Sequence, residues 1–432
     1  MSIPEFLAPL GLGLCLLTLA DLPQPLTLPE AEAAAQKNHP RISAAELRSL
    51  AVGETVTEAR SAYLPSLSGN VTAATPAADN ARIAAGGLNN PVIYPRAALG
   101  ITASQLITDF GRTANLVATS KFYAKAANEN VKVTAAQILL LTDTAYFAAL
   151  EAQAVQQVAS NTIVSRGLLL DRVTALAANQ LKSELDVSFA RVAYEEARLL
   201  QSRATNDLQA AFARLSNLLG YREAKTFALT DVDSTTNSLG EASPFIQAAL
   251  AHRPDLARLR DERDAALKFA KAEQALFYPT VSAFGTVGDI PVHDEHLPDN
   301  YAAAGLNLNL PLFNGFNNTA RKREAAFRAK AADETLREAE NEAISDVRVA
   351  WLNVTNARER LEIQRQLSTT ALSAFDLADA RYRAGSSSMV ELSQAQLNLT
   401  SAEIALASAR YELLIQQAVL NFQAGGALSE QR

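Results

Sequence analysis

The chain has 432 residues, of which 48% are hydrophobic, and a formal net charge of −7. This length and composition allow two or three buried cores and exclude a mainly disordered protein. Nucleic-acid binding has no general electrostatic support, because phosphate recognition requires clustered Lys and Arg. The single cysteine, Cys15, excludes an internal disulfide and a cysteine-rich metal site.

An apolar stretch from Phe6 to Ala20 opens the chain. It ends in Thr18-Leu19-Ala20, a small-x-small pattern that predicts a signal peptide of residues 1–20, cleaved before Asp21. No Lys or Arg precedes the stretch, so its positive charge is limited to the terminal amine. No later segment is expected to approach the roughly 20 apolar residues of a membrane-spanning helix. Any membrane crossing is therefore expected to use strands.

The two halves of the sequence repeat each other. Pro40 and Pro254 are 214 positions apart, and so are Pro65 and Pro279, within similar stretches. Further along the offset becomes 205, which relates Gly100 to Gly305, Tyr146 to Trp351, Asp186 to Glu391 and Gly220 to Gly425. Such self-similarity predicts repeat 1 at residues 21–220 and repeat 2 at 245–425, with a linker at 221–244 and a tail at 426–432.

Each repeat is expected to begin with a helix and continue with two strands. The helices run from about Ser43 to Tyr63 and from about Asp255 to Phe277, because prolines flank both segments. The strands are expected near residues 65–74, 97–107, 279–289 and 301–312. In Leu306–Leu310, leucines face one way and asparagines the other, which is typical of a strand with one oily and one wet face.

These strands have the length of tilted membrane strands, which is about 9 to 11 residues. Four such strands cannot close a barrel. Lipid does not tolerate open sheet edges, since it cannot hydrogen-bond their backbone groups. Closure must therefore come from other copies of the chain.

Long helical hairpins are expected at residues 113–219 and 319–424. Between Thr113 and Ala178 the sequence has no proline and one glycine, Gly167, which predicts a helix of roughly 100 Å at about 1.5 Å per residue. In the last helix, apolar residues recur at spacings of three and four, as in a coiled coil; they are Leu392, Ala395, Leu399, Ala402, Leu406, Ala409 and Leu413. The turn of the second hairpin is expected at Gly385-Ser386-Ser387-Ser388.

Three segments complete a resemblance to the TolC family of outer-membrane efflux proteins. SQLITDFGRT (Ser104–Thr113) and LPLFNGFNNT (Leu310–Thr319) follow the second strand of each repeat, and RYRAGSSSMVELSQAQ (Arg381–Gln396) forms the helical turn. The resemblance covers essentially the whole chain after residue 20. It implies a mainly α fold with a small transmembrane β part, in which a homotrimer forms an α-helical barrel and a twelve-stranded β-barrel.

The family's usual paired glycines after the strands are reduced to one each, in Phe110-Gly111 and Gly315-Phe316. We expect the change of direction between strand and helix to survive with a single glycine.

The resemblance also implies a function. The chain would be a passive exit duct in outer-membrane lipid of a Gram-negative bacterium, with a large periplasmic part. It would serve a tripartite efflux pump or a type I secretion system. Its partners would be a periplasmic adaptor and an inner-membrane pump of the RND, ABC or MFS type, with no cofactor and no nucleic acid. Neither the cargo nor the pump class follows from the sequence.

Matching to the family assigns the gate at the end of the helical duct to Asp186, Tyr382, Glu391 and Gln394. Partner docking is expected on the helical turns, at Gln180, Gly385, Ser386 and Ser387, because the turns lie at the end farthest from the strands. A hydrogen bond from the Tyr382 hydroxyl to Asp186 would bias the gate shut, and the charge on Glu391 would favour cations. Ser387 stands where the family has an arginine link. The alternative is that these residues only cap helices and form hairpin turns.

Two other classes of protein were weighed. A soluble coiled-coil scaffold would lack alternating strands between its helices, whereas both repeats contain them. An enzyme has little support: Asp109-Phe110-Gly111 copies a kinase string without the accompanying motifs and is expected to be a turn. His293-Asp294-Glu295-His296 could bind a metal, but it lies in a loop between expected strands.

Overall fold

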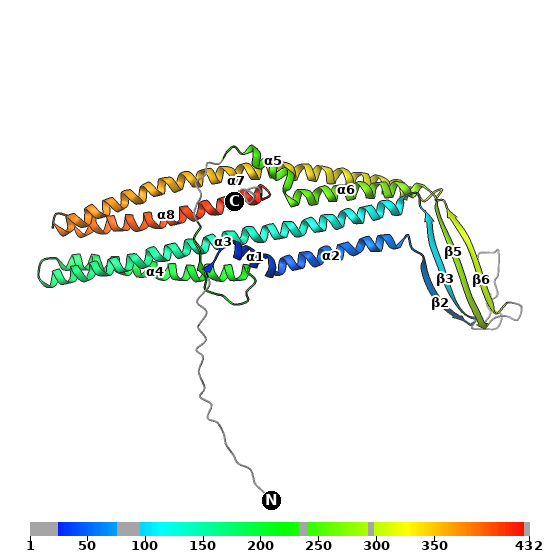
Figure 1. Ribbon diagram of the computed structural model, residues 1–432, viewed down its shortest axis with the longest axis horizontal. Helices are drawn as coiled ribbons and strands as arrows, with labels where there is room; N and C mark the ends of the chain where they lie inside the picture. The colour runs from blue at the N-terminus through cyan, green and yellow to red at the C-terminus, as the bar shows by residue number, and fades with distance from the viewer. Residues whose placement is uncertain (1–24, 76–95, 233–239, 293–297, 427–432) are drawn as a thin grey trace, which may run out of the picture. The chain divides into compact units, whose positions relative to one another are not determined.

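The computed structural model describes residues 25–75, 96–232, 240–292 and 298–426 (Figure 1). They form two compact units. The sheet unit comprises the described residues within His39–Leu140, Ser238–Asn356 and Gln416–Arg432, and the hairpin unit those within Met1–Asn38, Leu141–Asn237 and Ala357–Ile415. Each unit draws on both halves of the sequence, so the division into repeats stays a prediction. The expected signal peptide and the loop at 293–296 lie outside the described residues.

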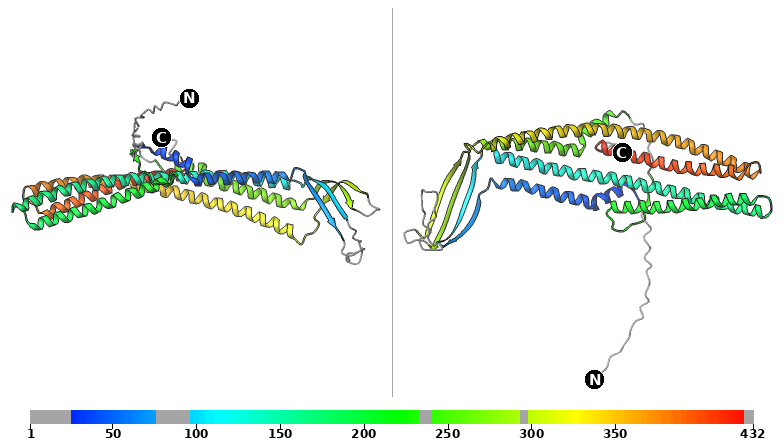
Figure 2. Two further views of the ribbon diagram at one scale, coloured as in Figure 1. Left: turned by 90° about the horizontal axis from the view of Figure 1, so that it is seen from below. Right: turned by 180° about the vertical axis from the view of Figure 1, so that it is seen from behind.

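The sheet unit is built around four antiparallel strands in the order β2-β3-β5-β6 (Figures 1 and 2). Their bounds are Ser66–Ala74 for β2, Arg96–Thr108 for β3, Thr280–Val292 for β5 and Asn300–Asn309 for β6. The alternating segments of the sequence thus form strands. β5 extends beyond its expected end to Val292, because Val292 still pairs with Ala97 of β3. β6 ends earlier than expected at Asn309, because Asn309 pairs with Thr280, the first residue of β5.

A pair of helices precedes each strand pair, where the sequence suggested a single helix. In the first half, α1 (Leu28–Asn38) lies in the hairpin unit and α2 (Pro40–Ser61) in the sheet unit. In the second half, α5 (Ser243–His252) precedes α6 (Pro254–Gln274) and a short 3-10 turn, η1 (Ala275–Phe277). Each proline opens the second helix, where its missing N–H costs nothing. The residue before it is extended and so separates the helices.

Strands lead into the long helices through pairs of residues in left-handed conformation. Phe110 and Gly111 have φ angles of 54° and 93°, and Gly315 and Phe316 have 64° and 65°. A single glycine thus suffices at each change of direction, with a phenylalanine in the strained position beside it. The kinase-like string is part of this turn, because Asp109 accepts hydrogen bonds from the Thr113 backbone N–H and hydroxyl, at 2.7 and 2.6 Å. It therefore caps a helix.

An ion pair with a buried carboxylate fixes the second of these junctions. Glu273, near the end of α6, is almost fully buried, and Arg321 of α7 (Asn317–Arg383) donates to both of its carboxylate oxygens at 2.7 and 2.8 Å. Two parallel hydrogen bonds give such a pair a defined geometry as well as energy. The start of α7 is therefore held against the end of α6.

The hairpin unit consists mainly of four long helical segments. α3 (Arg112–Ala178) and α7 each have 67 residues, and α4 (Glu184–Leu218) and α8 (Met389–Gln423) each have 35. At about 1.5 Å per residue, α3 and α7 are each roughly 100 Å long. Small residues are buried along the predicted coiled-coil seam; among them are Ala190, Ala197, Ala204, Ala402 and Ala409.

One tyrosine ties the N-terminal segment to the hairpin unit. Strands β1 (Pro25–Leu26) and β4 (Ala228–Leu229) form a short parallel pair. The hydroxyl of the fully buried Tyr146 lies 2.8 Å from the Leu26 carbonyl oxygen and 2.7 Å from that of Thr230. Burial raises the pKa of Tyr146 to about 12, so its hydroxyl remains a donor across the physiological range. In the sheet unit, Trp351, its counterpart at offset 205, donates to the Gly240 carbonyl at 3.0 Å.

By length and composition, α3 is the one helix of the described part of the chain that could cross a membrane. A third of the residues in the 18-residue apolar segment of α3 are buried. The expectation that no segment after residue 20 would be apolar enough is therefore wrong for α3. One such helix is weak support for a membrane span, because core helices of soluble proteins also pass this test.

Candidate functional site

The first candidate site is the sheet, whose two faces differ sharply. Along one face the register places apolar side chains on all four strands; they include Leu67, Val71, Leu99, Ile101, Val281, Val287, Ala302, Leu306 and Leu308. Most of the large ones are exposed, with Val71 86% and Leu306 72% accessible. A contiguous exposed apolar surface of this kind marks a membrane or protein contact.

The opposite face carries hydroxyl and amide groups. It presents Ser66, Ser68, Asn70, Thr72, Gly100, Thr102, Ser104, Ser282, Phe284, Thr286, Gly288, Tyr301, Ala303, Gly305, Asn307 and Asn309. Hydroxyls meet across the strands, since Ser66 Oγ lies 3.3 Å from Ser104 Oγ and Thr102 Oγ1 lies 3.2 Å from Thr286 Oγ1. This face is suited to water and the other to lipid, which is the arrangement of a membrane strand around an aqueous lumen.

Glycines on the polar face make room for aromatic rings. A Cβ at Gly100 or Gly288 would overlap the Tyr301 side chain, and one at Gly305 would meet the Phe284 ring at 2.9 Å. A ring that covers a strand glycine shields its backbone and fixes the strand register. These contacts between rings and glycines therefore fix the strand register, which keeps the polar and the apolar side chains on opposite faces of the sheet.

The second candidate site is the pair of helical turns in the hairpin unit. Between α3 and α4, Gln180 has a φ angle of 59°, and the Leu181 N–H donates to the Leu176 carbonyl at 2.9 Å. Ser183 then caps α4 reciprocally with Asp186, whose carboxylate accepts from the Ser183 hydroxyl at 2.9 Å. This is a left-handed helix end followed by a capping box.

The turn between α7 and α8 follows the same plan. Gly385 has a φ angle of 73°, and the Ser386 N–H donates to the Arg381 carbonyl at 2.9 Å. The Glu391 N–H donates to the Ser388 hydroxyl at 3.2 Å, which caps α8. Gln180 and Gly385 are related by the offset of 205. One turn therefore places glycine in the left-handed region and the other a glutamine.

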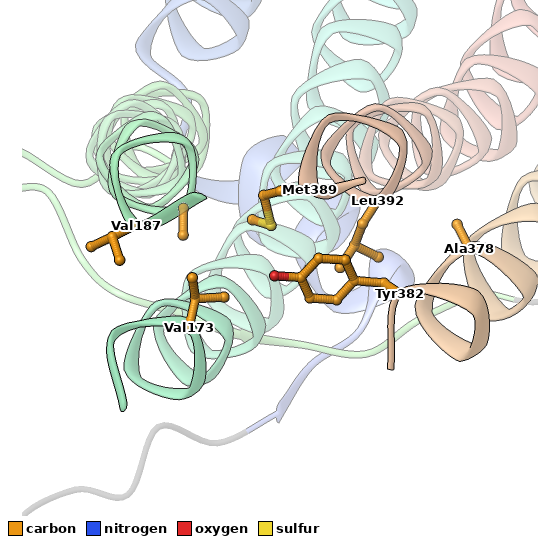
Figure 3. Close-up of a cluster of buried hydrophobic side chains, with 7 residues drawn as sticks. Val173, Val187, Ala378, Tyr382, Met389 and Leu392 are labelled. Atoms are coloured by element: carbon orange, nitrogen blue, oxygen red, sulfur yellow. The ribbon is translucent and has the colours of Figure 1, made fainter. Parts of the chain in front are cut away.

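Tyr382 lies inside the helical cluster beside these turns (Figure 3). It is 3% exposed and belongs to a cluster of buried residues from α3, α4, α7 and α8; the other members are Val173, Val187, Ala190, Ala378, Met389 and Leu392. Its hydroxyl has no hydrogen-bond partner within the described chain. Burial, together with the charge of Asp186, raises the pKa of Tyr382.

The remaining expected residues lie on the surface around this cluster. Glu391 forms an ion pair with Arg381 at 3.0 Å, and the Gln394 amide donates to Asn398 at 3.0 Å. The Ser386 hydroxyl donates to the Arg381 carbonyl at 3.1 Å, and the Ser387 hydroxyl to the Ser388 carbonyl at 3.4 Å. The predicted hydrogen bond from the Tyr382 hydroxyl to Asp186 is therefore not formed within the described chain, because the Asp186 carboxylate accepts from Ser183 instead. The side chains of Glu391 and Gln394 also face other partners.

One contact at the turns was not anticipated from the sequence. The ammonium nitrogen of Lys182 lies 4.2 Å from the centroid of the Tyr382 ring. The residues are 200 positions apart, and no periodic pattern relates them. Among the described residues, no group of three or more metal-binding side chains occurs.

The sheet has an exposed apolar face and a hydroxyl-rich face, and two of its strands lead into helices of 67 residues. This is the arrangement of a channel protein with a membrane sheet and a long helical part. The sequence matches the outer membrane efflux protein family over residues 33–221 and 245–426. The chain belongs to this family, whose members form channels. It is an outer-membrane exit duct of efflux or export systems, with a large periplasmic helical part.

Relatives in sequence cover nearly the whole chain. The outer membrane protein TolC of Escherichia coli is 26% identical, across 98% of this chain and 87% of that protein. TolC of Vibrio cholerae is 25% identical, across 98% and 96%. The outer membrane efflux protein BepC of Brucella suis is 23% identical, across 91% and 84%.

Solved structures share the fold. The outer-membrane channel OprN superposes with a TM-score of 0.80 at 20% identity, covering 92% of this chain and 90% of that chain. The outer membrane protein VceC of Vibrio cholerae gives a TM-score of 0.78 at 18% identity, covering 92% and 96%. These matches confirm the predicted fold class, and the match to the family over residues 33–221 and 245–426 confirms the predicted family.

Proposed function

We propose that the chain works as a homotrimer in which three four-stranded sheets close a twelve-stranded barrel. The observation that supports this is the two-faced sheet, since β2 and β6 have no outer strand partner among the described residues. An apolar face suits lipid, but the unpaired edges do not. Pairing β6 of one copy with β2 of the next satisfies both edges and keeps the apolar faces outside.

The helices then continue the barrel as a periplasmic tunnel. α3 and α7 each begin a few residues after a strand and end at a helical turn, so they connect the barrel to the turns. A periplasmic adaptor and an inner-membrane pump of the RND, ABC or MFS type deliver the cargo, and the duct performs no chemistry itself. The names of relatives mention antibiotics, toluene and pyoverdine, so the duct architecture accepts diverse cargo.

Around the buried Tyr382, the turns form the gate of the tunnel. The gate residues are Asp186, Tyr382, Glu391 and Gln394. The charge of Asp186 raises the pKa of Tyr382, and its carboxylate also caps α4, so the gate role and the capping role use the same group. Three copies of Glu391 add negative charge at the entrance, partly offset by Arg381.

The exposed turn residues serve as the docking surface for the partners. Gln180, Gly385 and Ser386 are exposed, and Ser387 is half-buried. Their backbone is fixed by left-handed helix ends, which present the turns in a defined shape. A rigid turn lowers the entropy cost of binding a partner.

The trimer is tested by native mass spectrometry of detergent-extracted protein. Three copies are expected, because each sheet leaves two edges that only neighbours can pair. Conductance across a planar bilayer should accompany the trimer and be missing from any monomer fraction. A stable, folded monomer as the main species would contradict the proposed homotrimer.

The charge at the gate is tested by ion selectivity in planar bilayers. Glu391→Gln should weaken cation preference, because it removes one negative charge per protomer. Arg381→Gln should strengthen it, because it frees Glu391 from its ion pair. Opposite changes separate an electrostatic role from loss of structure. Unchanged selectivity in both variants would remove Glu391 from the gate.

The docking surface is tested by Gly385→Val. A β-branched residue at a φ angle of 73° costs about 1–3 kcal/mol of backbone strain and should reshape the turn. Adaptor crosslinking and drug resistance should then fall while trimer assembly persists. Gly53→Val is the matched control, since an added side chain meets open space at Gly53, within α2. Full resistance and crosslinking in Gly385→Val would place docking elsewhere.

A further inference from the structure

Tyr382 belongs to the buried cluster in which the two hairpins meet near their turns. Its ring extends from α7 into this cluster, which includes Val173 of α3, Val187 of α4 and Leu392 of α8 (Figure 3). With 3% of its surface exposed, it is shielded from water. Whatever holds this ring in place therefore also holds hairpin α3/α4 against hairpin α7/α8.

The positively charged ammonium group of Lys182 lies over the face of that ring. Lys182 lies in the turn between α3 and α4, half-buried, with its ammonium nitrogen 4.2 Å from the ring centroid. A cation over an aromatic face is attracted by the negative potential of the ring, and the attraction grows when water is excluded. This contact joins a residue of one hairpin to a residue of the other.

The tyrosine hydroxyl does not make the connection within the chain. Its oxygen has no hydrogen-bond partner within the described residues. The neighbouring Asp186 uses its carboxylate to accept from the Ser183 hydroxyl at 2.9 Å and the Ser183 N–H at 3.2 Å. The ring face is therefore the part of Tyr382 that a charged group of the other hairpin contacts.

The contact occurs once per chain and not twice. At the offset of 205, Lys182 corresponds to Ser387 and Tyr382 corresponds to Ala177. The second turn thus has a serine where the first has the lysine, and the partner position on α3 has no ring. The internal duplication does not account for the pair, and no symmetric contact can compensate for its loss.

We propose that Lys182 is the positioning residue that holds the two hairpins together at their turns, so that removing its charge opens the duct. This inference rests on the proposed function of the turns as the gate. It assigns the closing contact to the cation and the ring face.

The test measures single-channel conductance of trimers in planar bilayers. Lys182→Gln keeps the length of the side chain but removes its charge, and should raise the ratio of open to closed channels about tenfold. Lys182→Arg should restore closure, because guanidinium also stacks on aromatic rings. The matched control is Lys225→Gln, which removes a similar contact elsewhere in the hairpin unit, where the Lys225 nitrogen lies 3.8 Å from the Tyr221 ring centroid.

Two variants of the tyrosine complete the design. Tyr382→Leu removes the ring face and should open the channel, after which adding Lys182→Gln should have little further effect. Tyr382→Phe retains the ring face and should open the channel less than Tyr382→Leu. Trimer content is measured by native mass spectrometry for every variant, so that loss of assembly is not mistaken for opening.

The outcomes distinguish this inference from the proposed function. If Lys182→Gln behaves like Lys225→Gln while Tyr382→Leu opens the channel, the gate survives and the role of Lys182 is refuted. The same holds if Lys182→Arg stays as open as Lys182→Gln. If the unmodified trimer conducts no ions under any condition, the exit-duct function itself fails.

Discussion

The structure depends on one constraint, which is that backbone N–H and C=O groups in lipid must find hydrogen-bond partners within protein. A four-stranded sheet with a mainly apolar face satisfies this constraint along β3 and β5 but leaves the outer edges of β2 and β6 without a strand partner among the described residues. In the proposed homotrimer, pairing with further copies would remove the edges, and the same closure would turn the hydroxyl-rich faces inward. The proposed barrel, lumen and oligomer all rest on the requirement that no strand edge meets lipid.

Rigid contacts concentrate where the chain changes from strand to helix and where its N-terminal segment docks. Glu273 accepts two hydrogen bonds from Arg321, and the buried hydroxyl of Tyr146 shares its proton between two carbonyl oxygens. At the helical turns the described contacts between hairpins are mainly apolar, together with the Lys182 ammonium on the Tyr382 ring. Further from the turns, the Gln396 amide of α8 donates to Ser165 Oγ of α3 at 3.2 Å. Apolar packing is less directional than paired hydrogen bonds. The turns are therefore the part of the hairpin unit best suited to rearrange.

Local patterns in the sequence predicted long helices with strands between them, because alternation in Leu306–Leu310 and helical periodicity over long proline-free segments are local signals. The family was predicted from the resemblance of three segments and of the repeated element order. The local patterns missed α1 and α5, which are short and separated from α2 and α6 only by the residue before a proline. Left-handed Gln180 could not be anticipated, since glutamine has no preference for that conformation. The contact of Lys182 with Tyr382 joins distant positions, which periodicity does not encode. The gate and docking residues stay predictions.

The central claim is that one face of the sheet lies in lipid and the other lines water. The most direct test is thiol labelling of the membrane-embedded trimer with a water-soluble maleimide, on a Cys15→Ser background. Thr102→Cys and Thr286→Cys lie on the hydroxyl face, and their neighbours Ile101→Cys and Val287→Cys lie on the apolar face. The account predicts rapid labelling of the first pair and protection of the second. Equal labelling of all four positions would contradict it.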